Sequence, residues 1–176
     1  MDQLMLLKPT KDYAEQIFNY RLAFIIQGEP LDGTGSLYRM PDPLEWIEQA
    51  EDLSKPETTP ENWDVTNQYL CVRPYDNALV GMILVRHTLN EYLSLYGGHV
   101  EYSVLPSERN KGYGTWMLKT VLPYCREFGV NKVLLACEPE NEAGLKVIRK
   151  NGGVLLDKVF DPEYDMEMER YVIDLG

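Results

Sequence analysis

The sequence predicts one α/β domain of the mixed α+β kind, with about seven strands and about four helices over residues 1–176. Two observations lead to this fold class. Hydrophobic residues recur at helical spacing in some segments and at every second position in others, and the two kinds of segment alternate along the chain. The length of 176 residues and the composition, 44% hydrophobic and 26% charged, are those of one globular domain that buries a core without disulfides or metals.

The first third of the chain predicts a strand and two helices joined by a long loop. A short strand at residues 3–7 ends before a proline, and Thr10 is a suitable N-cap for a helix over residues 11–27. Residues 28–43 are rich in glycine and proline and show no periodicity. A loop of this length inside a compact domain often has a function. An Asp-Pro pair then begins a second helix over residues 42–53.

In the remaining two thirds the hydrophobic period changes to two, and strands dominate. The pattern is interrupted by one long amphipathic helix that a glycine ends, and by a shorter helix ahead of a Gly-Gly turn. We expect strands at residues 68–73, 79–89 and 97–105, a helix at 113–128, a strand at 132–137, a helix at 141–150, and strands at 154–160 and 167–174.

Composition and charge exclude several classes of partner. The chain has 17 basic and 28 acidic residues, a net charge of −11, so we expect no nucleic-acid partner. No apolar run approaches the roughly 20 residues that span a bilayer, and no secretory signal follows the initial Met-Asp-Gln, which predicts a cytoplasmic protein without a membrane partner. Cys71, Cys125 and Cys137 form no metal-like pattern with His87 and His99, so we expect buried, reduced thiols and no metal.

A glycine-containing turn that opens the long helix carries the chemistry. It reads Arg109-Asn110-Lys111-Gly112-Tyr113-Gly114-Thr115 and follows a predicted strand. The first amides of a helix have no intrahelical partner and carry the positive end of the helix dipole, so such a turn binds anions. The glycines let a phosphate approach the backbone, and Arg109 and Lys111 add positive charge. The spacing fits neither the Walker pattern nor the dinucleotide-binding pattern; it is Arg-x-x-Gly-x-Gly.

This turn resembles motif A of the GNAT superfamily, the acetyl-CoA-dependent N-acetyltransferases. The strand at residues 133–138 and the segment 141–153 resemble the family's next strand, helix and turn, and residues 89–93 and 96–99 resemble a bacterial subgroup of predicted acetyltransferases. The resemblance implies a GNAT-like acyl-CoA N-acyltransferase fold, with a central, mostly antiparallel mixed sheet of about seven strands flanked by about four helices. It also implies transfer of an acetyl group from acetyl-CoA to an amine of a small molecule or a protein, by direct attack on the thioester.

The resemblance assigns cofactor-binding roles to matching positions. The backbone amides from Arg109 to Thr115 are expected to hold the CoA pyrophosphate. Val104 and Leu105 are expected to hydrogen-bond the pantetheine arm like an added strand and to polarise the thioester carbonyl, and Asn141 to touch the same arm. The charge distribution agrees, because residues 105–150 hold eight basic and five acidic residues in an otherwise acidic chain.

Proton transfer is assigned to the strand ahead of the turn. A general base must take a proton from the acceptor amine, and His99 and Glu101 face the same side of an extended strand. We expect Glu101 to be the base, with His99 as the second candidate. Many family members have a proton-donating tyrosine at the position of Ile148, so the sequence assigns no general acid; water, Tyr102 or Tyr113 remains to protonate the thiolate.

The acceptor is predicted only as a chemical class. Residues 1–64, which in the family's fold usually wall the acceptor site, hold 13 acidic and five basic residues, a balance that suits a cationic amine. The edge formed by the closing strands is a candidate surface for a homodimer. Two alternatives stay open from the sequence: a non-catalytic CoA-binding sensor or regulatory module, and an interaction domain without a cofactor.

Overall fold

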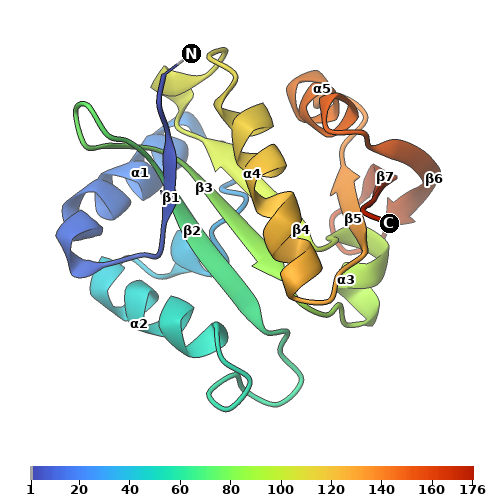
Figure 1. Ribbon diagram of the computed structural model, residues 1–176, viewed down its shortest axis with the longest axis horizontal. Helices are drawn as coiled ribbons and strands as arrows, with labels where there is room; N and C mark the ends of the chain where they lie inside the picture. The colour runs from blue at the N-terminus through green and yellow to red at the C-terminus, as the bar shows by residue number, and fades with distance from the viewer. Residues whose placement is uncertain (1) are drawn as a thin grey trace.

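The computed structural model describes residues 2–176 and contains two antiparallel sheets that meet at one pair of edges (Figure 1). The first sheet has the order β1-β2-β3-β4, with β1 at Met5–Leu7, β2 at Thr66–Arg73, β3 at Ala78–Arg86 and β4 at Val100–Val104. The second has the order β5-β7-β6, with β5 at Lys132–Cys137, β6 at Val154–Asp161 and β7 at Met166–Asp174. The expected mostly antiparallel arrangement of seven strands is confirmed for residues 2–176.

Helices cover both faces of the first sheet. The helices α1 (Ala14–Gln27) and α2 (Pro43–Leu53) pack on one face, and α4 (Tyr113–Glu127) packs against β3 and β4 on the other. The helix α5 (Glu142–Lys150) lies beside α4 at the junction with the second sheet (Figure 1). These four helices begin and end within a few residues of the predicted bounds. Within residues 2–176, no helix combines the length and the apolar character needed to cross a bilayer.

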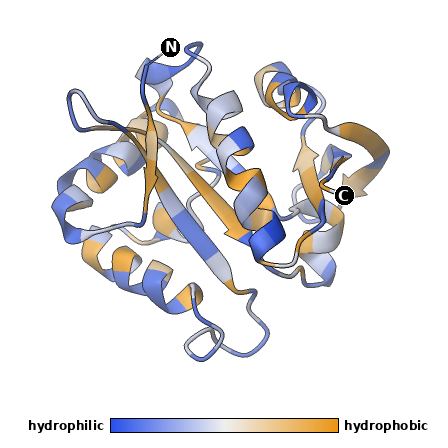
Figure 2. Cartoon of the chain, in the orientation of Figure 1, coloured by the Kyte–Doolittle hydropathy of each residue, from blue (hydrophilic) through white to orange (hydrophobic). Residues whose placement is uncertain are grey.

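The strand β3 separates two hydrophobic clusters. Val80, Ile83 and Val85 pack with α4, whereas Leu79 and Met82 pack with α1 and α2. Because helices cover both of its faces, β3 is a nearly continuous hydrophobic run instead of an alternating one (Figure 2). This double-sided packing fixes the position of β4, the neighbouring strand that borders the site described below.

A fifth helix, α3 (Glu91–Tyr96), was not predicted. The expected strands at residues 79–89 and 97–105 are shorter than predicted, because β3 ends at Arg86 and β4 begins at Val100. The Asn90 side chain starts the intervening helix by accepting the Leu93 N–H at 2.8 Å. A helix of six residues is too short for a hydrophobic period to reveal it.

The predicted capping role of Thr10 was wrong. Thr10 precedes a 3₁₀ turn at Lys11–Tyr13, and its side chain makes no capping hydrogen bond. The α-helix begins only at Ala14. At the other end the prediction holds, since Gly28 ends α1 in the left-handed conformation, with φ of 66°.

Candidate active site

The strands β4 and β5 are joined at one end only. The His99 N–H donates to the Leu134 carbonyl at 2.8 Å, and the Leu134 N–H donates to His99 Nδ1 at 3.0 Å. Gly98 makes this approach possible, because a Cβ at that position would lie 2.4 Å from the Leu134 carbonyl oxygen. Beyond this junction no ladder joins the described residues of β4 and β5. The two strands therefore leave an opening between the sheets.

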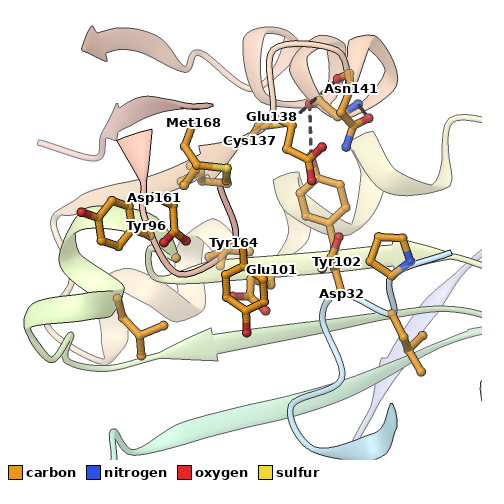
Figure 3. A pocket seen from close by; sticks show the side chains of 18 of the residues that line it. Asp32, Tyr96, Glu101, Tyr102, Cys137, Glu138, Asn141, Asp161, Tyr164 and Met168 are labelled. Atoms are coloured by element: carbon orange, nitrogen blue, oxygen red, sulfur yellow. Dashed lines mark hydrogen bonds between the residues drawn. The ribbon is translucent and has the colours of Figure 1, made fainter. Parts of the chain in front are cut away.

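A cavity of about 620 Å³ lies at this opening (Figure 3). One wall is β4 and the end of β5, and a second wall comes from α5. The loop between α1 and α2, the helix α3 and the β6–β7 hairpin supply the rest. Side chains that bear on the chemistry are Asp32, Glu101, Tyr102, Cys137, Glu138, Asn141 and Ile148. Six separate segments of the chain thus converge on one space.

The loop between α1 and α2 is pressed against β4 through a glycine. Gly33 has a φ of +73°, and a Cβ there would lie 2.5 Å from the Tyr102 Cα. The same loop is tied to β2, because Gln68 Nε2 donates to the Gly33 carbonyl at 2.8 Å. These contacts hold the neighbouring Asp32 at the cavity wall, beside the strand that carries Glu101. The expected functional role of the long loop is therefore supported by its position.

Acidic side chains from three segments face the cavity. Asp32 comes from the α1–α2 loop, Glu101 from β4 and Glu138 from the end of β5 (Figure 3). Asp32 reaches solvent through the mouth of the cavity, yet surrounding protein and the Glu101 and Glu138 carboxylates raise its pKa to about 6. No donor from residues 2–176 hydrogen-bonds its carboxyl. A fourth acid, Asp161, is buried and accepts the Tyr92 hydroxyl at 2.7 Å.

The structure separates the two residues predicted as general bases. Glu101 lines the cavity, where Arg86 Nη1 donates to its Oε1 at 2.9 Å. His99 does not line it; its ring closes the β4–β5 junction. Burial and the Arg86 charge lower the His99 pKa, which favours the neutral ring that Nδ1 needs in order to accept the Leu134 N–H. His99 thus has a positioning role in this structure.

The glycine turn forms the start of α4, as predicted. Gly112 takes a φ of +82° at the N-cap, and the first i→i−4 bond runs from the Trp116 N–H to the Gly112 carbonyl at 3.0 Å. The amides of residues 112–115 precede that bond and have no intrahelical partner. No acidic residue lies in the first turn of α4 to offset the positive end of the helix dipole.

Gly114 has a packing role that the sequence did not indicate. A Cβ there would lie 3.3 Å from Val147 Cγ2 of α5, and 3.8 Å from both Tyr102 and Val104 of β4. Its φ is not positive. The missing side chain therefore brings the start of α4 against β4 and α5, so that the free amides lie next to the place where β4 and β5 diverge.

The positive charges of the turn are less free than the sequence suggested. Arg109 forms an ion pair with Glu29 and donates from Nε to the Val104 carbonyl at 3.3 Å. Lys111 pairs with Glu108 at 2.6 Å, and Arg73 shares that carboxylate at 2.7 Å. The backbone of the turn is consequently its more available anion-binding element.

The residues predicted to bind pantetheine differ in whether their hydrogen-bonding groups are already used within the protein. The Leu105 N–H already donates to the Val80 carbonyl in β3 at 2.9 Å. Since hydrogen-bonding groups alternate along an antiparallel strand, the Val104 N–H is directed to the opposite edge, toward β5. Asn141 lines the cavity at the start of α5, where its Oδ1 accepts the Gly144 N–H at 2.9 Å.

Only one of the two candidate proton-donating tyrosines lines the cavity. Tyr102 does, and its hydroxyl donates to the Gly144 carbonyl at 3.2 Å (Figure 3). The Tyr113 hydroxyl instead bonds Asp2 and receives a hydrogen bond from Arg73 at 3.1 Å. Ile148 also lines the cavity and is buried, so the position has no proton to give.

All three cysteines are free and buried, as expected. Cys137 is the one in the cavity wall, and burial raises the pKa of its thiol to about 12. At neutral pH it is a neutral thiol and a poor nucleophile. Among residues 2–176 no group of three His, Cys, Asp or Glu side chains is arranged to hold a metal ion.

The sequence analysis did not select Asp32 or Glu138 as site residues, and only their positions in the chain could have indicated them. Asp32 lies within the long loop that was expected to be functional, and Glu138 ends the strand that resembles a family element. Neither belongs to a residue pattern with known spacing. The approach of Asp32 to Glu101 depends on the close contact of Gly33 with β4, and Glu138 reaches the cavity from the end of β5; only the folded chain reveals both.

Comparison with known families gives a family match over most of the chain. The model of the acetyltransferase (GNAT) family matches residues 36–153. No curated protein sequence matches the chain.

Solved structures share the fold at low sequence identity. The ribosomal-protein-S5-alanine acetyltransferase from Vibrio fischeri has a TM-score of 0.76 at 16% identity, over 100% of this chain and 95% of that one. The microcin C7 self-immunity acetyltransferase MccE, in complex with acetyl-CoA and AMP, has a TM-score of 0.75 at 14% identity, over 99% and 93%. Mycobacterium smegmatis RimJ, in complex with CoA-disulfide, has a TM-score of 0.71 at 16% identity, over 97% and 81%. At these identities the similarity establishes the fold.

Proposed function

The chain belongs to the acetyltransferase (GNAT) family, and we propose that it moves an acetyl group from acetyl-CoA to a cationic amine by direct attack on the thioester. One observation carries the proposal: the start of α4, with its free amides, packs against Tyr102 of β4, and Tyr102 also borders a cavity lined by carboxylates. A thioester placed in the opening between β4 and β5 has its phosphates on one side and an acceptor on the other.

The cofactor is proposed to lie along the opening, with the family's mode of binding. The pyrophosphate takes the backbone amides from Arg109 to Thr115, helped by the dipole of α4. The pantetheine arm hydrogen-bonds the free edge of β4 at Val104 and passes Asn141. Solved members of the fold such as MccE bind acetyl-CoA, which supports this arrangement.

The acidic cavity suits an acceptor that arrives as an ammonium ion. The carboxylates of Asp32, Glu101 and Glu138 attract the cation, and tyrosine side chains such as Tyr38 and Tyr164 add aromatic surface around it. A lysine-like amine has a pKa of about 10.4, so its neutral form costs about 4–5 kcal/mol at pH 7. The ammonium must therefore give its proton to a base before the nitrogen attacks.

We propose Glu101 as that base, with Asp32 beside it as a second carboxylate that binds the ammonium. Glu101 lies on β4, the strand along which the thioester is placed, while Arg86 holds one of its oxygens. Asp32 has no competing partner among residues 2–176, and its raised pKa brings its protonation near neutral pH. His99 is proposed to act only by holding the β4–β5 junction.

The transfer step itself uses no covalent enzyme intermediate. The amine nitrogen forms a bond to the thioester carbon, and the C–S bond breaks with its electron pair on sulfur. Cys137 takes no part, since its thiol is un-ionised. The proposed proton donor to the thiolate is the Tyr102 hydroxyl, which lies at the cavity wall between β4 and α5.

The test combines binding with turnover. Calorimetry with acetyl-CoA should detect binding, and free thiol should accumulate when a panel of primary amines is added. Cationic diamines and lysine-like amines should exceed neutral or anionic amines in kcat/KM. Glu101→Gln should keep acetyl-CoA affinity and lose turnover. Absence of any acetyl-CoA binding would overturn the proposal, and binding without turnover on any amine would favour a sensor module instead.

A further inference from the structure

The cavity contains a second carboxylate, Asp161, away from the group formed by Asp32, Glu101 and Glu138. Asp161 ends β6, and β7 lies between β6 and β5, the strand that Glu138 follows. Neighbouring strands lie about 4.8 Å apart, so the backbones of β5 and β6 are separated by about 10 Å. In the view of Figure 3, Asp161 and Asp32 lie toward opposite sides of the cavity. The cavity therefore has two separate acidic places.

Asp161 is a buried carboxylate without a positive partner in the protein. It is only 3% exposed, although it lines the cavity. Its oxygens accept the Tyr92 hydroxyl at 2.7 Å and the Glu163 N–H at 2.9 Å. Within the described chain, no basic side chain forms an ion pair with it. Burial of an unpaired charge is costly, and a carboxylate has more acceptor sites than these two donors use, so a cation entering the cavity would be stabilised here.

Tyrosine side chains line the cavity around this carboxylate. Tyr92 and Tyr96 come from α3, with ring centroids 5.1 Å apart, and Tyr164 comes from the β6–β7 hairpin. The faces of aromatic rings attract cations. Burial and the Asp161 carboxylate raise the pKa of the Tyr92 hydroxyl, so this group stays protonated and donates to Asp161. One negative charge framed by aromatic rings has the chemistry that recognises an ammonium group.

We propose that Asp161 and these three tyrosines bind an ammonium group, and that the acceptor is a linear aliphatic diamine whose other amine is acetylated beside Glu101; the second part rests on the proposed acetyl transfer. Met166 and Met168 share one face of β7, between the two acidic places, and give the alkyl chain an apolar wall. Because Asp161 is buried, the second charge must arrive at the end of a thin, flexible chain. This favours a small molecule over a folded protein as the acceptor.

Binding of both ends implies that only one end is acetylated. The ammonium beside Glu101 gives its proton to that carboxylate, the nitrogen bonds to the thioester carbon, and the C–S bond breaks with its electron pair on sulfur. The product keeps one ammonium and carries one neutral amide. When it binds in the reverse direction, the amide faces Asp161, which is again without a cation. Mass spectrometry should therefore detect the monoacetyl diamine and little of the diacetyl product.

The first experiment compares two amines that differ by one charge. Putrescine and n-butylamine have the same carbon chain and are both cations near neutral pH. Wild-type kcat/KM should be about tenfold or more higher for putrescine, the gain expected from one hydrogen bond between charged groups. Asp161→Asn should bring this ratio close to one. Glu163→Gln is the matched control, because it removes a negative charge from the same hairpin at an exposed residue outside the cavity wall, and its ratio should equal the wild-type ratio. A wild-type ratio near one, or the same decrease in both variants, would overturn the proposal.

The second experiment measures binding without turnover. Calorimetry of the protein with CoA, which has no acetyl group to transfer, should show that putrescine binds about tenfold or more tightly than n-butylamine. Tyr96→Leu should reduce this difference while the circular-dichroism spectrum stays unchanged, so the test does not depend on the folding of Asp161→Asn. Equal affinities for the two amines would refute the ammonium site. Tighter binding of putrescine without acetyl transfer to any amine would support the site and overturn the proposed function alone.

Discussion

His99 and Leu134 join the two sheets through a side chain as well as through the backbone. The His99 ring accepts the Leu134 N–H at Nδ1, at 3.0 Å, while the His99 N–H donates to the Leu134 carbonyl at 2.8 Å. The ring thus takes the place that a backbone carbonyl would have if β4 and β5 continued to pair. The junction ends one sheet-like contact and begins the opening that borders the cavity.

This junction should weaken in acid. Burial and Arg86 lower the His99 pKa in the folded state, so the unfolded chain binds a proton first as the pH falls. The stabilising contribution is complete above the unfolded pKa of about 6.5 and is lost progressively below it. His99→Leu should cost about 1–3 kcal/mol at pH 7.5, because it leaves the Leu134 N–H unpaired. Urea unfolding at pH 5, 6 and 7.5 measures the effect.

His99→Leu should also reduce the decrease in the free energy of unfolding that the wild type shows as the pH falls below about 6.5. The His87 pKa is lowered by burial as well, so His87→Leu is the control that removes the other histidine. Each single variant should lose part of the slope below pH 6.5. If the free energy of unfolding of His99→Leu fell below pH 6.5 as steeply as that of the wild type, the neutral His99 ring would not be bonding the Leu134 N–H.

A second prediction concerns Gly33. An alanine there meets both the strain of a φ of +73° and a contact of 2.5 Å with the Tyr102 Cα, so the loop must move off β4. Gly33→Ala should raise KM for the amine and leave acetyl-CoA affinity unchanged. Gly28→Ala is the matched control, since Gly28 has a φ of +66° and an added Cβ there would meet nothing within 4 Å. Equal kinetic defects in the two variants would mean that backbone strain alone is responsible.

The bounds of β5 could be predicted from the sequence, whereas the set of residues that line the cavity could not. The strand at residues 132–137 and the start of α4 at Tyr113 were predicted at their observed bounds, because each depends on local signals such as hydrophobic period and glycine. The position of His99 was not predictable, since alternation on a strand gives its side but not the neighbour that approaches it. Asp32 was hidden for the same reason: the long-range contact of Gly33 with β4 brings it to Glu101. Features that depend on one segment, such as a helix start, could be predicted from the sequence. Features that depend on the packing of two distant segments could not.

Asp32 should destabilise the folded protein above its own pKa. Protein surroundings and two neighbouring carboxylates raise that pKa to about 6, so the folded state holds its proton more tightly than the unfolded chain does. Stability due to this group is therefore greatest in acid and falls as the pH rises from about 4 to about 6. Asp32→Asn should raise Tm at pH 7.5, and the gain should shrink toward pH 4.

The same variant separates stability from function. Asp32→Asn should lose kcat/KM for cationic amines while it gains Tm, as expected for an active-site charge held at a cost to folding. Scanning calorimetry and thiol-release kinetics on one preparation give both values. A variant with lower Tm at pH 7.5 would contradict the unfavourable environment inferred for this carboxyl.

Cys137 should be dispensable for chemistry. Its pKa of about 12 leaves almost no thiolate at neutral pH, so an acetyl-cysteine intermediate is not expected. Cys137→Ala should keep most of its turnover, and mass spectrometry of the wild-type protein with acetyl-CoA alone should detect no added acetyl group. An acetylated Cys137 peptide would replace direct attack with a two-step mechanism.

Tyr102 and Tyr113 offer a paired test of the proton donor. Tyr102→Phe keeps the ring between β4 and α5 and removes the hydroxyl that bonds the Gly144 carbonyl. Loss of a general acid costs roughly 10²–10⁴ in rate when the leaving group is poor. A thiol with a pKa of about 8.5 leaves readily, so kcat should fall only about tenfold while KM for acetyl-CoA stays unchanged. Tyr113→Phe removes a hydroxyl that bonds Asp2 and Arg73 outside the cavity, and its kcat should equal that of the wild type. A rise in KM for acetyl-CoA in Tyr102→Phe, with kcat preserved, would instead make Tyr102 a binding residue and leave water as the proton donor.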